Sequence, residues 1–196
     1  MGKDASPSKY ALLGFLSLRP MSGYDIKKTV EQSIAYFWNE SYGQIYPLLK
    51  KLAGEGLAIR RTEKNSGKPD RLVYSITDRG REELRRWLAR APQTQPPRSE
   101  LLLKLFFSSP QDLAANLSHV EEMRATHRAA LTEYDRVEQQ LRRQHGRHPR
   151  LAFWMLTLDF GRRRSLAIVR WCDATHRALR GMRSHSRSSK PKGAVS

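Results

Sequence analysis

The chain is poor in features that mark several large classes of protein. Its 196 residues include one cysteine, Cys172, which excludes an internal disulfide framework and fits a reducing compartment. No run of about 18 apolar residues occurs, so no segment is predicted to span a bilayer. Residues 1–8 are too polar for a signal peptide. We therefore expect a cytoplasmic protein.

Signatures of catalysis and metal binding are also missing. The six histidines do not fall at zinc-ligand spacings, and His145 and His148, beside Gly146, form at most an isolated metal pair. No phosphate loop, dinucleotide fingerprint or nucleophile elbow occurs. Cys172 follows Trp171 in an apolar segment, a setting more typical of a packed than of a redox-active thiol. We expect no enzymatic activity, no cofactor and no bound metal.

Acidic side chains are scarce beside basic ones. The chain has 36 Lys and Arg against 19 Asp and Glu, a net charge of +17 and an isoelectric point near 10.6. Such a charge favours polyanionic partners, nucleic acid first and an anionic membrane surface second. Both halves of the chain are basic, so charge alone does not locate a binding face.

The first half predicts three short helices with recognisable start signals. The first is expected over about residues 9–18, with Ser8 as its N-cap, and a second starts at Ser22, where Asp25 completes a near capping box. The third, over 41–52, has the capping-box pair Ser41 and Gln44. Pro47 lies past its first turn, which predicts a kink or a looser start.

Two short strands and a fourth helix follow. Leu57 and Ile59, then Leu72, Tyr74 and Ile76, alternate with polar residues as in half-buried strands, and residues 62–70 between them are rich in turn formers. Thr77 or Asp78 caps a helix with Leu84, Trp87 and Leu88 on one face. Helices followed by a hairpin in this order predict a winged helix-turn-helix, which binds duplex DNA.

The spacing assigns roles to several polar side chains on the third helix and the hairpin. Gln44 suits adenine edges, Ser41 and Tyr42 suit bases or phosphates at the helix N-terminus, and Lys50 and Lys51 suit phosphates. Tyr46 suits the core or a phosphate. In the wing, Lys64, Lys68 and Arg71 would lie over the DNA backbone. The alternatives are that Gln44 only caps the helix, that the tyrosines pack, and that the wing is a solvated charged turn.

The second half predicts a helical domain. Residues 91–98 read as a proline-rich linker, followed by an apolar helix at 101–107, a long helix from Ser109 to about Gln144, and a last helix to Leu179. Its apolar stripes are too wide for one hairpin to bury, so we expect a symmetric dimer. The residues expected to mediate dimerisation are Leu113, Leu117, Val120, Leu131, Leu158, Leu166 and Val169.

The chain resembles the PadR family of bacterial transcriptional regulators. The similarity covers Tyr10 to Trp87 and a looser match in the last helix. The matching segments are 11–16, 22–27, 41–52, 56–57, 68–74, 77–80 and 156–161, with Trp171 ten residues on. The resemblance implies a homodimer that usually represses and that often releases DNA on binding a small aromatic or hydrophobic ligand. It also adds Tyr24 to the expected DNA contacts.

The aromatic residues near the domain junction are the candidate walls of an effector cavity: Trp38, Phe106, Phe107, Trp154 and Trp171. The alternative is that they form ordinary dimer core.

The predicted fold is mainly α with a small β-hairpin. It comprises a flexible arm (1–8), a winged helix-turn-helix domain (9–90), a linker (91–98), a helical dimerisation and effector domain (99–179) and a disordered basic tail (180–196). The leading hypothesis is a sequence-specific, ligand-responsive homodimeric repressor that binds a two-fold operator. A non-specific architectural nucleic-acid-binding protein and a protein-interaction module that has lost DNA binding are the alternatives.

Overall fold

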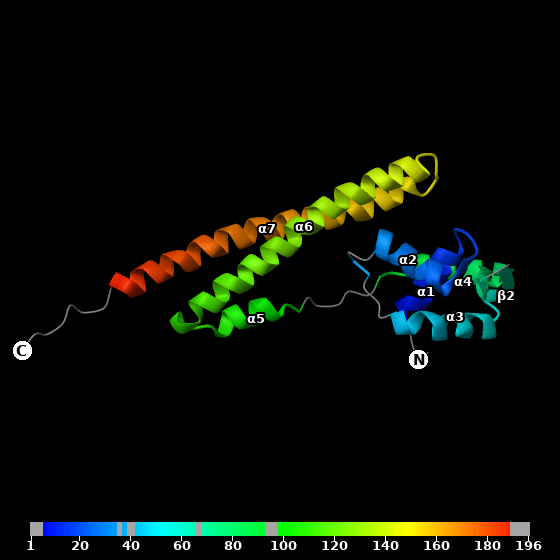
Figure 1. Cartoon of the computed structure of the whole chain (residues 1–196), viewed down its shortest axis with the longest axis horizontal. Helices are drawn as coiled ribbons and strands as arrows, with labels where there is room; N and C mark the ends of the chain where they lie inside the picture. The colour runs from blue at the N-terminus through cyan, green and yellow to red at the C-terminus, as the bar shows by residue number, and fades with distance from the viewer. Residues whose placement is uncertain (1–5, 35–36, 39–41, 66–67, 93–97, 189–196) are drawn as a thin grey trace, which may run out of the picture. The chain divides into compact units, whose positions relative to one another are not determined.

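The chain divides into two compact units, Met1–Thr94 and Gln95–Ser196. The computed structural model (Figure 1) describes residues 6–34, 37–38, 42–65, 68–92 and 98–188. The division falls inside the proline-rich stretch 91–98.

The N-terminal unit combines helices with a small antiparallel sheet, as predicted. The sheet order is β1-β3-β2, so β3 is the central strand. In chain order the elements are α1 (Pro7–Leu16), β1 (Met21–Ser22), α2 (Gly23–Ser33), the 3-10 turn η1 (Tyr42–Gln44), α3 (Ile45–Gly54), β2 (Ala58–Asn65), β3 (Lys68–Ile76) and α4 (Asp78–Leu88).

One apolar core joins α1, α2, α3, α4 and the sheet. Leu13, Ile26 and Leu49 are fully buried in it. The ring of Trp87 stacks on Tyr10 at 4.7 Å, and the Tyr10 hydroxyl donates to Glu83 at 3.0 Å. Burial, and then the hydrogen bond and charge of Glu83, raise the pKa of Tyr10. These contacts attach α4 to α1.

The segment Thr77 to Gly80 forms the start of α4, and the contacts of its first and last residues show why a threonine and a glycine stand there. Thr77 caps the helix by accepting the Gly80 N–H at 3.0 Å, and its own hydroxyl donates to the Gly56 carbonyl at 2.8 Å. A Cβ on Gly80 would lie 2.1 Å from the Leu57 carbonyl oxygen. Only glycine allows α4 to approach the backbone at Leu57, between α3 and β2, this closely.

The first helix starts earlier than predicted. Ser6, rather than Ser8, is the N-cap of α1, and Pro7 occupies the first helical turn, where its missing N–H removes no helical hydrogen bond. The helix ends at Leu16 rather than Leu18. The expected arm 1–8 is therefore wrong at its last residues, and residues 1–5 lie outside those described.

The predicted strand pattern is wrong at two positions. Ile59 is 50% exposed because side chains alternate along a strand and buried Ala58 takes the core-facing position beside it, and Leu72, which precedes the buried residues of β3, is 45% exposed. The strand β2 begins at Ala58, so Leu57 precedes it and does not set its alternation. On α4, Leu88 is 68% exposed because it is the last helical residue and leaves the packed face to Leu84 and Trp87.

The C-terminal unit is helical, as predicted. It comprises α5 (Glu100–Phe107), the 3-10 turn η2 (Pro110–Asp112), α6 (Leu113–His145) and α7 (Leu151–Ser188). Figure 1 shows α6 and α7 running antiparallel as a long hairpin. None of the described helices combines the length and apolarity that crossing a membrane requires.

Polar contacts interrupt the apolar seam of the hairpin. Arg124 on α6 binds Asp173 on α7 at 2.9 Å. Arg162 on α7 binds both Asp135 and Glu138 on α6, at 2.9 and 2.8 Å. These long-range pairs hold the two helices in one register, which gives Arg162 a structural role.

The predicted disordered tail is wrong for its first part. The helix α7 continues to Ser188, past the expected end at Leu179. Extending an existing helix orders one residue per added hydrogen bond, so Arg, Met and other helix-compatible residues continue it without a new nucleus. Residues 189–196 lie outside those described.

A half-buried histidine predicts a pH dependence of stability. His127 Nδ1 lies 3.0 Å from Ser165 Oγ, with Ser165 buried in the hairpin. Burial, and secondarily the charge of Arg164, lower the pKa of His127 below the ordinary 6.5. Below that value the unfolded chain binds a proton more readily than the folded chain, so stability present at neutral pH is lost as pH falls.

We expect His127→Gln to reduce the loss of thermal stability between about pH 7.5 and pH 5. The measurement is the unfolding midpoint by circular dichroism across that range. The control is His119→Gln, which removes an imidazole from the same helix outside this contact and should keep the wild-type slope. An unchanged slope in His127→Gln would assign the pH dependence to other groups.

Candidate nucleic-acid interface

The start of α3 differs from the predicted capping box and resolves the position of Pro47. A 3-10 turn precedes the helix, which begins at Ile45, so Pro47 is its third residue. The first N–H groups of a helix have no partner within it, so a proline there breaks no hydrogen bond. The predicted looser start is confirmed.

At the start of α3, Gln44 does not cap the helix through its own side chain. Gln44 occupies the N-cap position but makes no side-chain capping bond, and it is exposed. Ser41, the other half of the predicted box, lies outside the described residues. The predicted pairing of Gln44 with Ser41 therefore stays a prediction.

The helix α3 separates cleanly into a buried and an exposed face. Ile45, Leu49 and Leu52 are buried. Tyr46 is 60% exposed, and Lys50 and Lys51 are exposed with it. Together with the Gln44 amide at the start of the helix, the phenol and two ammonium groups of α3 supply the donors and acceptors that base edges and phosphates require.

The exposed tyrosines lie where α2 meets α3. A Cβ added to Gly23 would lie 2.5 Å from Cε1 of Tyr46, so the ring packs directly on the Gly23 backbone. The next residue, Tyr24, is 64% exposed. Glycine at 23 therefore permits the close approach that sets Tyr46 beside the start of α2.

A carboxylate joins this helix junction to the sheet. Asp25 accepts the N–H of Ser22 at 2.8 Å and the hydroxyl of Ser22 at 2.9 Å, the predicted capping interaction. It also accepts a hydrogen bond from Nη2 of Arg71 on β3. Burial alone would raise the pKa of Asp25, but the hydrogen bonds from Ser22 and the charge of Arg71 hold it below its ordinary value.

The Asp25 contact changes the interpretation of Arg71. The sequence places Arg71 in the wing as a backbone contact, whereas the structure turns its guanidinium toward α2. Pairing of Ser22 with Val73 in the β1–β3 ladder adds a main-chain link at the same place. Arg71 thus positions the wing relative to the helices.

The wing carries basic residues that the sequence reasoning overlooked. Lys64 is exposed on β2 as predicted, and Arg60 and Arg61 on the same strand are exposed as well. The adjacent arginines that follow the apolar residues 57–59 were the sequence signal that could have indicated them. The side chains of Lys68 and Tyr42 lie outside the described residues.

The predicted dimerisation residues have mixed environments. Leu113, Val120 and Leu158 are buried within the hairpin of a single chain, so this chain itself accounts for their burial. The residues that remain partly or largely accessible are Leu117, Leu131, Val169 and Leu166.

The predicted effector residues are not brought together within either unit. Trp38 belongs to the N-terminal unit and is half-buried. In the helical unit, Phe106 and Phe107 on α5 contact edge to face and are 80% and 75% exposed. Trp154 instead stacks on His148, and Trp171 lies further along α7.

The described residues contain no group of three or more potential metal ligands. Cys172 is fully buried, and burial is the main cause of the raised pKa of its thiol, which disfavours the reactive thiolate.

Comparison with known proteins assigns the chain to a family. Residues 12–86 match the model of the transcriptional regulator PadR-like family, and residues 97–180 match the virulence activator alpha C-terminal model. The probable transcriptional regulator Rv1176c of Mycobacterium tuberculosis is 32% identical over 139 residues, which cover 66% of this chain and 74% of that protein. The chain belongs to the PadR-like family of transcriptional regulators.

A second relative strengthens the assignment. The negative transcriptional regulator PadR of Bacillus subtilis is 40% identical over 102 residues, 52% of this chain; the alignment spans 56% of that relative's length. Its crystal structure with operator DNA covers 90% of this chain and 99% of its own, with a TM-score of 0.77 at 28% identity. Its structure with p-coumaric acid covers 87% and 97%, with a TM-score of 0.67 at 28% identity.

The Arg71 contact predicts a separation of stability from DNA affinity in this PadR-like protein. Arg71→Ala leaves the Asp25 carboxylate without its cation, and we expect a loss of roughly 1 to 3 kcal/mol in the free energy of unfolding. Lys64→Ala removes an exposed wing charge and should change stability by less than about 0.5 kcal/mol.

The measurements are urea unfolding and the salt dependence of binding to duplex DNA. Lys64→Ala should make the slope of log K against log salt less steep by about 1, because one phosphate contact is lost. Arg71→Ala should leave that slope unchanged. The reverse pattern would return Arg71 to the list of phosphate contacts.

Proposed function

We propose that this PadR-like transcriptional regulator is a homodimeric, sequence-specific repressor that binds a two-fold operator through α3 and the wing. The observation that carries the proposal is that Tyr46 and Lys50 on α3, and Gln44 at its N-cap, are exposed and stand clear of the core. A helix of this kind fits the major groove, where base pairs show distinct patterns of donors and acceptors.

The relative's structures support the same use of the fold. Bacillus subtilis PadR is described as a negative regulator and has been crystallised with operator DNA. By analogy, α3 would contact base edges, Lys50 and Lys51 would contact phosphates, and the wing would extend along the backbone through Lys64, Lys68, Arg60 and Arg61.

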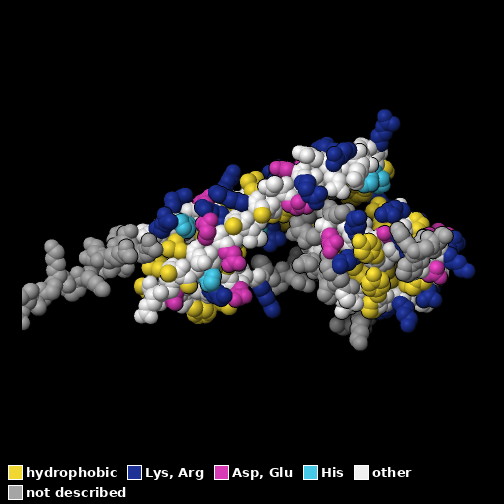
Figure 2. Space-filling model, in the orientation of Figure 1, with side chains coloured by type: hydrophobic (Ala, Val, Ile, Leu, Met, Phe, Trp, Pro, Cys, Tyr) yellow, Lys and Arg dark blue, Asp and Glu magenta, His cyan; other side chains and the backbone are white. Residues whose placement is uncertain are grey.

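The helical unit supports a second copy of the chain as partner. Phe153, Leu156 and Phe160 lie on one face of α7 at helical spacing and are 68%, 66% and 63% exposed. Phe106 and Phe107 expose a further apolar surface on α5, and yellow side chains gather on that side of the unit (Figure 2). A two-fold interface would cover such surfaces in both subunits at once.

The response to a ligand rests on the relative crystallised with p-coumaric acid. We propose a small aromatic or hydrophobic effector, with Trp38, Phe106, Phe107, Trp154 and Trp171 as candidate contacts. The effector would lower DNA affinity by binding more tightly to a dimer whose two recognition helices are spaced unfavourably for the operator.

Substitution of Gln44 tests sequence-specific binding. Duplexes selected from a random pool by the wild-type protein serve as probes, with scrambled duplexes of the same length as controls. We expect Gln44→Ala to weaken binding to the selected duplex by about 1 to 3 kcal/mol while leaving the scrambled duplex unaffected. Lys50→Ala is the matched variant, and it should weaken both equally because phosphates carry no sequence information.

Two outcomes would contradict this proposal. Equal wild-type affinity for both duplexes at every salt concentration would indicate an architectural nucleic-acid-binding protein. Failure to bind either duplex would indicate a protein-interaction module.

A charge in the exposed apolar row of α7 tests the dimer. Phe160→Asp should shift the chain from dimer to monomer in sedimentation equilibrium, because the dimer would bury an unpaired carboxylate. Folding of the single chain should persist, since the side chain is already exposed. Thr132→Asp adds the same charge at an exposed polar position on α6 and should stay dimeric. A wild-type chain that is monomeric at micromolar concentration would exclude this assembly.

A further inference from the structure

The turn between α6 and α7 concentrates positive charge that the proposed DNA-binding face does not use. Between Glu138 and Asp159 the sequence has no acidic residue, but it has four arginines and two histidines. The basic residues are Arg142, Arg143, His145, Arg147, His148 and Arg150. Dark-blue and cyan side chains mark this end of the hairpin in Figure 2. We call residues 142–150 the hairpin tip.

Helix electrostatics accounts for only part of this charge. Arg142 binds Glu138 at 2.8 Å, and cations in the last turn of α6 are favoured by its dipole. Arg147 and Arg150, however, directly precede the positive end of α7, whose first turn has no acidic residue. A cation there is unfavourable for the fold. Arg143 and Arg147 form no ion pair with any acidic residue in the described part of the chain.

The turn holds these side chains on a compact backbone. The His148 N–H donates to the His145 carbonyl at 2.8 Å, and the Leu151 N–H donates to the His148 carbonyl at 3.0 Å. The His148 ring stacks on Trp154 with centroids 4.6 Å apart, and its Nδ1 accepts the Arg150 N–H at 3.1 Å. Arginines mounted on an ordered turn lose less entropy on binding than arginines on a free loop.

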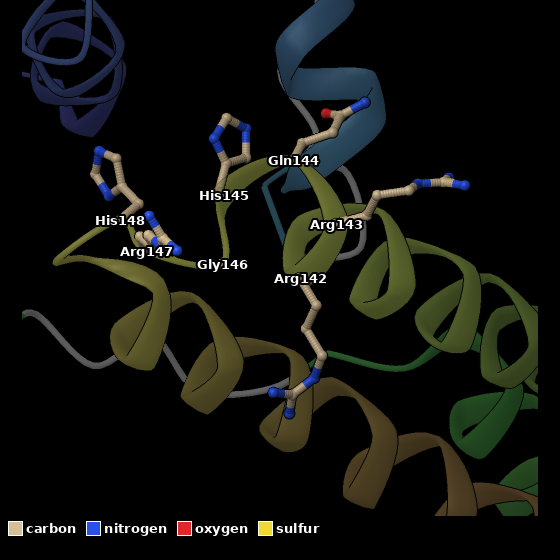
Figure 3. A pocket seen from close by; sticks show the side chains of 7 residues that line it. All are labelled: Arg142, Arg143, Gln144, His145, Gly146, Arg147 and His148. Carbon is tan, nitrogen blue, oxygen red and sulfur yellow. The ribbon is translucent and has the colours of Figure 1, made fainter.

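The arrangement of the side chains indicates the kind of anion. Residues 142–148 line an open hollow at the tip, but their charged groups do not converge on one point (Figure 3). Arg142 and Arg143 point to different sides, and Arg147 lies with His148 on the other side of the turn. Charges spread in this way fit a row of phosphates better than one compact anion.

We propose that the hairpin tip is a second DNA-contacting surface, which binds backbone phosphates while the winged helix of a subunit occupies the operator. This inference rests on the proposed function, since DNA bound through α3 brings phosphates to a high effective concentration near the rest of the protein. The tip contributes affinity and salt dependence, and no base specificity, because arginines on phosphates do not read sequence.

The test compares two charge-matched double variants of the full-length protein. One carries Arg143→Gln and Arg147→Gln at the tip. The control carries Arg170→Gln and Arg177→Gln, which remove the same charge from exposed positions elsewhere on α7. Binding is measured by fluorescence anisotropy with the selected and scrambled duplexes, over about 50 to 200 mM salt.

We expect the slope of log K against log salt to be less steep in the tip variant than in the control, by about 2 per bound chain. The ratio of the affinities for the selected and the scrambled duplex should stay unchanged. All four side chains are exposed, so circular dichroism should show wild-type helix content in both variants. A photo-crosslinking amino acid at Gln144 should give a covalent adduct with the selected duplex in the wild-type background.

Equal slopes in the two variants, or absence of the adduct at Gln144, would overturn the proposal. Binding of poly-glutamate or of phosphatidylglycerol vesicles that the tip variant alone loses, with the DNA slope unchanged, would also overturn it and assign the surface to another polyanion. The Lys50→Ala variant separates the two hypotheses. If Lys50→Ala binds DNA as the wild type does, the proposed function fails. If Lys50→Ala weakens DNA binding but the tip variant does not, only the proposal for the hairpin tip is rejected.

Discussion

The carboxylate of Asp25 is the contact on which the geometry of the DNA-facing unit depends. It receives hydrogen bonds from the start of its own helix and from Arg71 on the central strand, 46 residues away in the chain. The same residue thus caps α2 and fixes that helix to the sheet. Tyr46 packs on Gly23 at the adjoining position, which links the start of α3 to the start of α2. The proposed recognition by α3 requires that this helix be held at a defined angle to the wing, and this small polar cluster supplies such a constraint.

The helical unit combines register-setting polar contacts with an unfinished apolar surface. Arg124 and Arg162 bind acidic residues across the α6–α7 hairpin, and His127 meets Ser165 inside it. Polar groups buried in a helix pair favour one alignment, since any shift would leave them unpaired. The row at Phe153, Leu156 and Phe160 stays outside this core. The hairpin is complete as a folded element, while its exposed face is consistent with assembly.

Local signals predicted the order of elements well. The caps at Ser22 and Thr77, the loose start of α3 and the long helix after Pro110 depend on neighbouring residues, and they appear where the sequence placed them. The errors share a cause of another kind. Ile59 lies on the face of β2 opposite buried Ala58, Leu72 precedes the buried residues of β3, and α7 continues beyond Leu179 because an existing helix extends at little cost. Sequence periodicity gives a side chain's face, and it does not show how far the packed region reaches.

The sequence by itself determined the class of the protein: the winged-helix motifs at their spacing, the basic composition and the apolar helical second half specify a PadR-like regulator. It also placed Tyr46 and Lys50 on one helix, with Gln44 at its start. Only the tertiary structure decided that Arg71 faces Asp25 and that Leu113, Val120 and Leu158 are buried within one chain. The reason is that helix caps and turns depend on a few adjacent residues. The partner of a charged or apolar side chain depends on elements that only folding brings together.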